Sequence, residues 1–411
     1  MPIYYTCRKC RKDYSKEEYS HSKFCNECGS FLLLSFRKEA PQVAAVQPNS
    51  NAHSDRFALH RAADSLRTRI NRSKEFEIVS DTEKEQTKGH SFESWMWSSE
   101  FEAALKLKKT LMEKYNGVDL EDAIPGKVVS NEQGECYVVS ASCSSNFKKV
   151  TYDESRRIII SDLKVLSGIG PVRELALREQ GYKTIKDLEN HPIWQNEARK
   201  FMEMVDKKEV DSTQKWLWQR LPKSHPFLHY LAGFCQDQDF AIVDIETLGL
   251  SERPIILLGL AKIDKDKICT SQFLLRDIPD EPGAIWALVS QLEPKLSLIT
   301  YNGRSFDIPY IKQRLAYYGL DSALNNPHFD VLHFTRRALK PKLSDYRLDT
   351  VEKYIGIKRD INIPGGLVPH FYDTYLRTKN VGPLVPIVEH NKQDLLTLGS
   401  LFSKLYEEWN L

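Results

Sequence analysis

The chain has 411 residues and a mass of 47.5 kDa, which is long for one ordinary domain and predicts two or three. Its hydrophobic and charged fractions, 41% and 28%, are near globular averages and exclude a chain that is disordered throughout. No apolar run reaches the roughly 18 residues of a membrane helix, and the N-terminus lacks a signal-peptide pattern. We therefore expect a cytoplasmic protein without a membrane partner. The net charge is only +2, but residues 1–75 carry 14 Lys and Arg against 8 Asp and Glu, which favours a polyanionic partner.

Four of the eight cysteines lie near the N-terminus as two Cys-x-x-Cys pairs, Cys7 with Cys10 and Cys25 with Cys28. Two such pairs can turn four thiolates toward one tetrahedral Zn²⁺ ion. The ion would replace the hydrophobic core that so short a segment cannot build. We predict a zinc ribbon with a structural Zn²⁺ over residues 1–36; two disulfides are the alternative. A ribbon can bind nucleic acid or protein, and the neighbouring basic residues favour nucleic acid.

Residues 37–90 are predicted to be a linker and a basic arm, because large apolar residues are sparse in them and arginines are frequent. The arm could equally be a basic helix or solvated, partly disordered chain. Residues 91–230 are expected to form a helical and hairpin region. Apolar residues recur at helical spacing in its first part, up to residue 116. Residues 128–139 then predict a β-hairpin that turns near Gly134.

Within this region, residues 158–190 contain the run Ser-Gly-Ile-Gly-Pro, followed by a predicted helix that ends at Gly181 and then by a second predicted helix. The segment resembles the helix–hairpin–helix motif. Gly168 and Gly170 would let the backbone approach a phosphate, and Pro171 in the first helical turn would leave neighbouring N–H groups facing the anion. Such a contact gives affinity for nucleic acid without sequence preference. A hairpin that only packs against the neighbouring domain is the alternative, and a dinucleotide-binding loop is disfavoured because the third glycine is missing.

From residue 238 to 411, apolar strands alternate with amphipathic helices, which predicts an α/β domain. Its first strand begins at Phe240. Side chains alternate along a strand, so Asp244 and Glu246 should point to one face. Two adjacent carboxylates repel each other unless a cation lies between them. This pair alone is a weak signal, because exposed strands carry it by chance.

Two later segments carry further polar side chains. An apolar strand ends at Asn302 and a helix starts near Ser305, which places Asp307 beyond a strand end, the usual place of ligand sites in α/β sheets. Asp in a first helical turn is also favoured by the helix dipole. The last helix carries His390 and Asp394 four residues apart, and hence on one face, at the edge of an apolar stripe. Each feature taken alone is more typical of a structural role.

Together and in this order, the three segments resemble the DEDD exonuclease superfamily, and within it the YprB-type branch. The sequence motifs that carry this resemblance are DIETLGL (244–250), YNGRSFD (301–307), RDINIPG (359–365) and HNKQDL (390–395). The resemblance covers about 170 of the 411 residues and does not include the zinc ribbon. Three residues separate His390 from Asp394, as in YprB-like sequences, whereas the common DnaQ-type exonucleases have four.

The resemblance implies an RNase H-like fold, in which helices flank a mixed sheet, and a two-metal exonuclease of 3′-to-5′ polarity. Asp244, Glu246, Asp307 and Asp394 would hold two Mg²⁺ or Mn²⁺ ions, which prefer oxygen ligands. His390 would act as the general base or would position the attacking water. The interpretation requires these five side chains to meet in one acidic pocket that no basic side chain fills.

The resemblance also implies contacts with the substrate. Thr247 and Leu248 resemble the segment that grips a terminal nucleotide. Asn302 and Ser305 would support the site or contact the strand. With the two glycines of the hairpin, these four complete the predicted substrate-binding residues.

The sequence thus predicts an exonuclease that degrades DNA in repair or processing, with a helicase or another repair protein as a protein partner. One alternative is an RNA-trimming 3′-to-5′ exoribonuclease of the same fold. A second is a catalytically inactive adaptor that binds nucleic acid, and a third is endonuclease or flap activity. Four carboxylates and a histidine with no evident structural benefit argue against the inactive adaptor.

Overall fold

The structure is a computed structural model, and it describes residues 4–6, 13–14, 33–35, 92–145, 147–321, 324–340, 342–359 and 363–409. The chain divides into two compact units, residues 1–73 and 74–411. In the first unit, β1 (Tyr4–Thr6) pairs antiparallel with both β2 (Asp13–Tyr14) and β3 (Leu33–Ser35). The linker and basic arm predicted over residues 37–90 lie outside the described residues, and so do the four predicted zinc ligands, Cys7, Cys10, Cys25 and Cys28.

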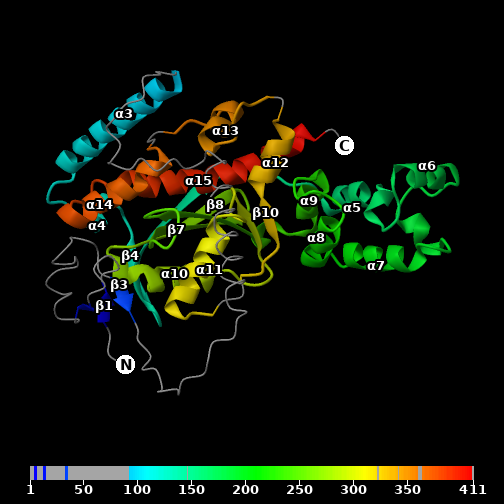
Figure 1. Cartoon of the computed structure of the whole chain (residues 1–411), viewed down its shortest axis with the longest axis horizontal. Coiled ribbons are helices and arrows are strands. Elements are labelled where there is room, and N and C mark those ends of the chain that lie inside the picture. The colour runs from blue at the N-terminus through cyan, green and yellow to red at the C-terminus, as the bar shows by residue number, and fades with distance from the viewer. Residues whose placement is uncertain are drawn as a thin grey trace, which may run out of the picture. The chain divides into compact units, whose positions relative to one another are not determined.

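A seven-stranded mixed sheet organises the second unit (Figure 1). Its strands, in spatial order, are β10 (His328–Asp330), β9 (Ser297–Thr300), β6 (Phe240–Thr247), β7 (Ile255–Asp264), β8 (Lys267–Leu274), β5 (Gly134–Ser144) and β4 (Lys127–Asn131). β10, β9 and β6 run parallel, and all the other neighbours are antiparallel. The sheet confirms the predicted α/β class and the mixed sheet of an RNase H-like fold.

The central strands are apolar along most of their length. β6 and β7 read FAIVDIET and IILLGLAKID, and nearly every residue in them is buried. Strands that are covered on both faces carry continuous apolar runs of this kind. The predicted hairpin is confirmed as β4 and β5, with its turn just before Gly134. β5 also pairs with β8, so the hairpin extends the sheet although it precedes residue 238 in the chain.

Helices cover both faces of this sheet. The long helix α15 (Leu384–Lys404) packs on β6, β7 and β8, and α10 (Glu281–Val289) packs on β5, β7 and β8. The other helices and helical turns of the domain are α3 (Phe92–Lys114), α4 (Leu120–Ala123), η5 (Ile278–Asp280), α11 (Asp307–Tyr318), α12 (Val331–Ala338), α13 (Leu348–Ile355), η6 (Gly365–Leu367), α14 (Val368–Thr378) and η7 (Leu405–Glu408). α3 and α15 confirm the two long helices predicted from periodicity. Over the ranges that the structure describes, no helix is long and apolar enough to cross a membrane.

The segment between β5 and β6 is mainly helical, as predicted. Its elements are α5 (Tyr152–Ile160), η1 (Leu163–Val165), α6 (Pro171–Glu179), η2 (Lys186–Asn190), α7 (Gln195–Asp206), α8 (Val210–Trp218), α9 (Pro226–Tyr230), η3 (Leu231–Phe234) and η4 (Asp237–Asp239). α6 confirms the helix predicted to end at Gly181, but the second helix expected after it is not an α-helix. A short 3₁₀ turn, η1, precedes the glycines, and the segment after Gly181 is the 3₁₀ helix η2. The helix–hairpin–helix motif therefore stays a prediction.

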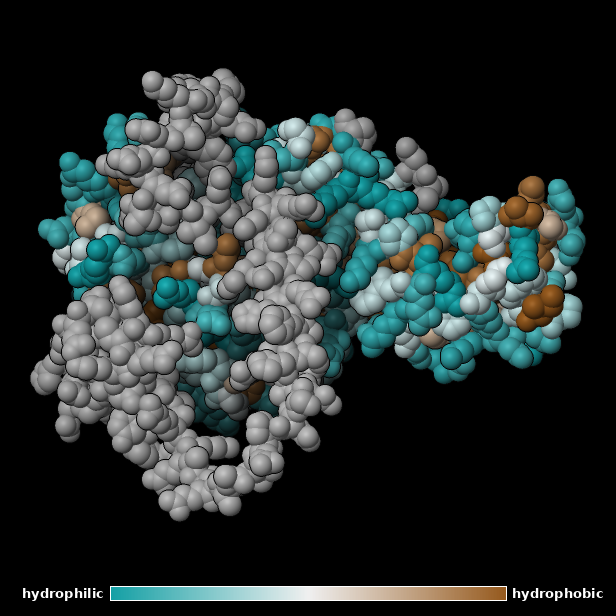
Figure 2. All heavy atoms as spheres, in the orientation of Figure 1, coloured by the Kyte–Doolittle hydropathy of each residue, from teal (hydrophilic) through white to brown (hydrophobic). Residues whose placement is uncertain are grey.

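Most of the surface that is coloured in Figure 2 is polar, and apolar colour appears over the helical segment around α6 (Figure 1). Among the described residues, the large apolar side chains with the highest exposure are Val172, Leu175 and Ile193, at 83%, 61% and 73%. Two of the three lie on α6 itself, which carries the predicted phosphate-binding turn at its N-terminus.

Candidate active site

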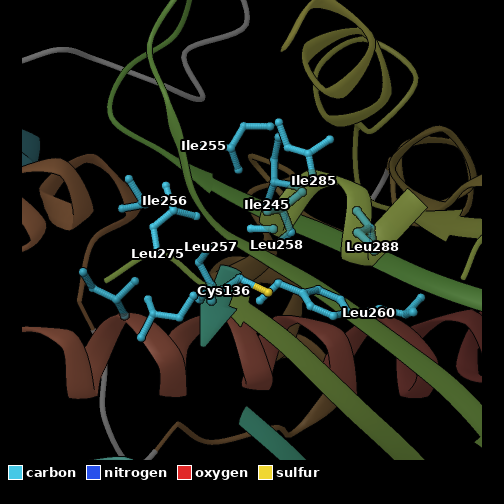
Figure 3. Close-up of a cluster of buried hydrophobic side chains, with 14 of the residues drawn as sticks. Cys136, Ile245, Ile255, Ile256, Leu257, Leu258, Leu260, Leu275, Ile285 and Leu288 are labelled. Carbon is cyan, nitrogen blue, oxygen red and sulfur yellow. The ribbon is translucent and has the colours of Figure 1, made fainter. Parts of the chain in front are cut away.

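The centre of the candidate site is β6, in the middle of the sheet. Asp244 and Glu246 alternate with Val243 and Ile245, as predicted. Ile245 packs into the apolar cluster that also contains Ile285 and Leu288 of α10 (Figure 3). The two carboxylates consequently lie on the other face of β6, toward α15.

A tight turn after β9 positions the third carboxylate. Asn302 has a positive φ of 63°, and a Cβ atom on Gly303 would lie only 2.3 Å from Oγ1 of Thr300. The backbone N–H groups of Asn302 and Arg304 both donate to the carboxylate of Asp330, at 2.9 and 3.1 Å. Glycine is therefore required at this turn by the close approach of Thr300, and the fixed turn sets the start of α11.

Asp307 is the first residue of α11, and it is 4% exposed. Its Oδ1 accepts a hydrogen bond from the backbone N–H of Ile245, at 3.2 Å. This contact joins the start of α11 to the middle of β6. Asp307 is thereby held beside the two carboxylates of β6, as the motif order predicts.

α15 supplies the remaining two predicted residues from consecutive turns. Nε2 of His390 lies 3.5 Å from Oδ2 of Asp394 and 3.8 Å from Oε1 of Glu246. One ligand atom from each of these three side chains lies within 4.8 Å of the other two. The three are close enough to bind one metal ion together.

The carboxylates of the cluster are buried and close together, so both desolvation and mutual repulsion disfavour their charged forms. Burial, and then the carboxylates of Asp394 and Asp307, raise the pKa of Asp244 and that of Glu246 well above the usual range. Burial also raises the pKa of Asp307 to about 7. The same burial lowers the pKa of His390. Carboxylates that repel one another in this way are stabilised by cations, and their hard oxygen atoms fit Mg²⁺ or Mn²⁺.

Arg359 begins the motif RDINIPG (359–365), and no role was predicted for its side chain. It follows α13, and its guanidinium forms an ion pair with Oδ1 of Asp394 and lies 2.9 Å from Nδ1 of His390. It also pairs with Glu352, which is 2% exposed, at 2.5 and 2.9 Å. One side of the pocket is thus filled by a basic side chain, contrary to the wholly acidic pocket that was expected.

Arg359 neutralises only one carboxylate oxygen of the cluster. Arg359 contacts Oδ1 of Asp394, whereas Oδ2 faces His390. Within the described part of the chain, no Lys or Arg forms an ion pair with Asp244, Glu246 or Asp307. These three carboxylates and one oxygen of Asp394 remain available to cations.

A second set of residues missed by the sequence reasoning orients Asp244. The side-chain amide of Asn391 donates to Oδ2 of Asp244 at 2.7 Å, and Oδ1 of Asn391 accepts from Gln272 at 2.9 Å. A Cβ atom on Gly259 would lie 2.3 Å from that same Oδ1, so only glycine leaves space for the amide. The only sequence feature that could have indicated this role is the position of Asn391, an uncharged amide directly after His390 in a helix that packs on the sheet.

Of the predicted substrate-binding residues, Thr247 ends β6, and Leu248, Asn302 and Ser305 lie in the loops that follow β6 and β9. Oγ1 of Thr247 donates to the carbonyl of Gly249, and the N–H of Leu248 donates to the carbonyl of Pro254. Ser305 is exposed, and its N–H donates to the carbonyl of Asn302. Since β6 and β9 are parallel, the loops after them leave the same edge of the sheet. The contacts of Gly168 are local to its own turn, where its carbonyl accepts from Arg173.

The raised pKa of Asp307 predicts how stability depends on pH. Asp307 has a pKa of about 7 in the folded chain and 3.8 when unperturbed, so its ionisation costs more free energy in the folded state. Its contribution to stability is full below pH 4 and is lost as the pH rises toward 7. Without added divalent cations, the melting temperature of the wild-type protein should fall across this window more steeply than that of Asp307→Asn. Thermal melts with and without Mg²⁺ test this, and equal slopes for the two proteins would contradict it.

The part of the chain that resembles known proteins contains the same residues. Residues 241–406, which include all five predicted catalytic residues, match the family model of the RNase H superfamily. Over 192 residues the chain is 34% identical to the uncharacterized protein YprB of Bacillus subtilis (strain 168). That match covers 45% of this chain and 46% of YprB, so the chain spans about half the length of the curated relative that it matches.

Similar solved structures include E. coli exonuclease I in complex with a dA16 oligonucleotide, at 18% identity and a TM-score of 0.24. This match covers 39% of this chain and 45% of that one. A second is the same enzyme in complex with a dT13 oligonucleotide, at 17% identity and a TM-score of 0.24, covering 38% and 45% of the two chains.

Proposed function

We propose that this chain, whose residues 241–406 form an RNase H superfamily domain, is a metal-dependent exonuclease that removes nucleotides from the 3′ end of DNA. One observation carries the proposal. Asp244, Glu246, Asp307 and Asp394 come from three separate elements and meet with His390 in one buried cluster. A cluster of like charges costs stability and gives the fold nothing in return, which is typical of a functional site.

The four carboxylates would hold two Mg²⁺ or Mn²⁺ ions, which stabilise the attacking water and the leaving 3′-oxygen. Asp244 and Asp307 are already oriented for this task, by the amide of Asn391 and the N–H of Ile245. Fixed ligands need no rearrangement when charge develops, which favours catalysis. His390 would act on the attacking water, either as a base or as a positioning group.

The loops at the same edge of the sheet would hold the end of the polymer. Thr247 and Leu248 would grip the terminal nucleotide, and Asn302 and Ser305 would contact the strand. The DNA duplex or single strand would enter across this edge, where the parallel strands β6 and β9 end. A helicase or another repair protein would supply the substrate.

The Gly-x-Gly turn before α6 would hold the backbone of the polymer. Gly168 has a positive φ of 76°, which favours glycine, and a Cβ atom on Gly170 would meet no atom within 4 Å. Gly170 caps α6 without a side-chain hydrogen bond, so no capping side chain satisfies the first N–H groups of this helix. These features support a phosphate contact. The zinc ribbon, with its four cysteines and a structural Zn²⁺, would add a further contact with nucleic acid.

Gly170 offers a direct test of the turn, because its φ of −98° and ψ of −179° are accessible to any residue. Gly170→Asp should lower affinity for DNA about tenfold, regardless of sequence, since it places a negative charge where a phosphate would bind. Gln180→Asp adds the same charge at the exposed C-terminal end of α6 and should change affinity little. Binding measured by fluorescence anisotropy compares the two. Unchanged affinity in Gly170→Asp would favour the packing alternative.

The function itself is tested with end-labelled oligonucleotides. The purified protein is incubated in Mg²⁺ or Mn²⁺ with DNA and RNA that carry a label at the 5′ or the 3′ end. We expect 5′-labelled DNA to give a ladder of shortened products and 3′-labelled DNA to release the labelled nucleotide at once. A ladder from RNA alone would favour the exoribonuclease. Internal fragments would favour an endonuclease, and binding without products would favour an inactive adaptor.

A further inference from the structure

One loop of the helical segment contacts the predicted phosphate-binding turn. This loop, residues 219–225, joins α8 to α9. Near its start, the guanidinium of Arg220 donates to Oγ of Ser167 at 3.0 Å, and Ser167 directly precedes Gly168 of the Gly-x-Gly turn. Cζ of the same arginine lies 4.8 Å from the ring centre of Trp216 on α8. The loop is thus anchored beside the Gly-x-Gly turn.

The same loop begins beside the turn that leads into the candidate active site. Trp218 is the last residue of α8, directly before the loop, and Cζ of Arg304 lies 4.0 Å from the centre of its ring. Arg304 belongs to the turn between β9 and α11, where its backbone N–H donates to Asp330. α11 then begins with Asp307. The chain around the start of this loop is therefore joined to both regions that are proposed to hold the polymer.

Two exposed cations lie beyond this point, one in the loop and one on α12. Lys223 lies in the loop, and Arg337 lies in the last turn of α12. α12 is next to α9 (Figure 1), and the rings of Phe334 and His229 are stacked there, 5.1 Å apart. Over the described ranges, neither Lys223 nor Arg337 forms an ion pair. Both charges are thus available to an anionic partner.

Each of these cations acts on a histidine of the other element. Burial, and then the charge of Arg337, lower the pKa of His225 in the loop to about 4. Burial also lowers the pKa of His333 on α12, and the charge of Lys223 adds to this effect, although Asp330 opposes it. The charges of the loop and of α12 therefore lie within reach of each other and make one basic surface.

We propose that Lys223 and Arg337 form a surface that binds phosphates of a nucleic-acid strand between the Gly-x-Gly turn and the candidate active site. The inference rests on the proposed function and adds the path by which the polymer reaches the site. A strand held at both places must cross the protein between them. Its phosphates repeat along that path, so each cation can bind one of them without reading the bases.

Charge reversal tests this surface without relying on hydrolysis. The full chain with Lys223→Glu and Arg337→Glu is compared with the wild-type protein for binding a fluorescent single-stranded DNA of about 16 nucleotides, by anisotropy in EDTA. We expect affinity to fall about tenfold, and the slope of log affinity against log salt concentration to become shallower by about 1.4, since each phosphate contact on a single strand contributes about 0.7. An unchanged affinity or an unchanged slope would overturn the proposal.

The matched control is Lys127→Glu with Lys267→Glu, which makes the same change in net charge on two exposed lysines. Lys127 begins β4 and Lys267 begins β8, and both strands lie on the opposite side of β6 from β10, the strand that leads into α12. This variant should bind like the wild-type protein. Equal losses in the two double variants would mean that net charge alone determines binding, and the surface would be rejected.

A second variant covers the case in which the charge-reversed protein does not fold. Lys223→Gln with Arg337→Gln removes both charges without adding repulsion. It should make the salt slope shallower by the same amount, because the same two phosphate contacts are lost, and it should lower affinity less than charge reversal does. A salt slope equal to that of the wild-type protein counts against the surface here too.

Hydrolysis of two substrates distinguishes the inference from the proposed function. A DNA of about four nucleotides is too short to extend from the site along this surface, whereas one of about 16 nucleotides can do so. In Mg²⁺, the charge-reversed variant should keep wild-type kcat/KM on the short DNA and lose about tenfold on the long one. Equal losses on both would contradict the proposed path. A wild-type protein that binds through these cations but releases no nucleotide overturns the proposed function alone.

Discussion

Asp244→Asn should lower metal-dependent hydrolysis at least about 10³-fold, which corresponds to about 4 kcal/mol in activation free energy. Asp244 lies at the centre of the cluster, and its pKa is raised by burial and by the carboxylates of Asp394, Asp307 and Glu246. Asn has nearly the same volume and can still accept the hydrogen bond from Asn391. The substitution therefore removes a negatively charged ligand and leaves the packing unchanged.

The same variant should be more stable than the wild-type protein when divalent cations are absent, because one of several repelling buried charges is gone. Rates on a labelled oligonucleotide, Mn²⁺ binding by calorimetry and thermal melts measure the three effects. Asp264→Asn, on the exposed end of the neighbouring strand β7, is the matched control and should change none of them. Near-wild-type activity in Asp244→Asn would remove this residue from the site.

Arg314→Met should lower the free energy of unfolding by about 3–5 kcal/mol, since it leaves a buried carboxylate without its counter-ion. Glu281 on α10 is fully buried, and Arg314 on α11 binds both of its oxygens, at 2.7 and 2.5 Å. The carboxylate also accepts from the N–H of Ile255 and from the hydroxyl of Tyr318. The pair thus ties α11, which begins at Asp307, to the sheet and to α10.

Urea denaturation of the full chain measures this effect. The double variant Glu281→Met with Arg314→Met should recover much of the loss, because replacing both partners of a buried pair by apolar residues is often nearly neutral. Arg377→Met, which breaks an exposed pair with Asp373, should cost less than about 1 kcal/mol. If Arg314→Met is as mild as Arg377→Met, the buried pair contributes little to stability.

Several parts of the fold could be predicted from local patterns. The strand at Asp244, the hairpin that turns before Gly134 and the helix that carries His390 and Asp394 were all expected from periodicity, and the structure contains them. Such patterns depend on residues a few positions apart, so one sequence is enough to reveal them. Near the Gly-x-Gly turn, α6 was expected, but η1 and η2 were not predicted as 3₁₀ elements, because they are too short to show a clear helical period.

The pairing of elements distant in the chain could not be predicted in the same way. The hairpin joins β8 through a long antiparallel register that begins at Tyr137, and no local pattern marks that partner. The same holds for the amide of Gln272, which reaches the site only because β8 and α15 pack together. These contacts depend on tertiary packing across more than a hundred residues.

For this protein, the sequence by itself determined which acidic side chains make up the candidate site, because each of them lies in a short sequence motif. Only the tertiary structure decided what surrounds them. It placed Arg359 against Asp394 and His390, and it placed Asn391 against Asp244 in the space left by Gly259. The physical reason is that the hydrogen bonds of a buried side chain are set by the atoms packed around it, and those atoms come from elements far apart in the chain.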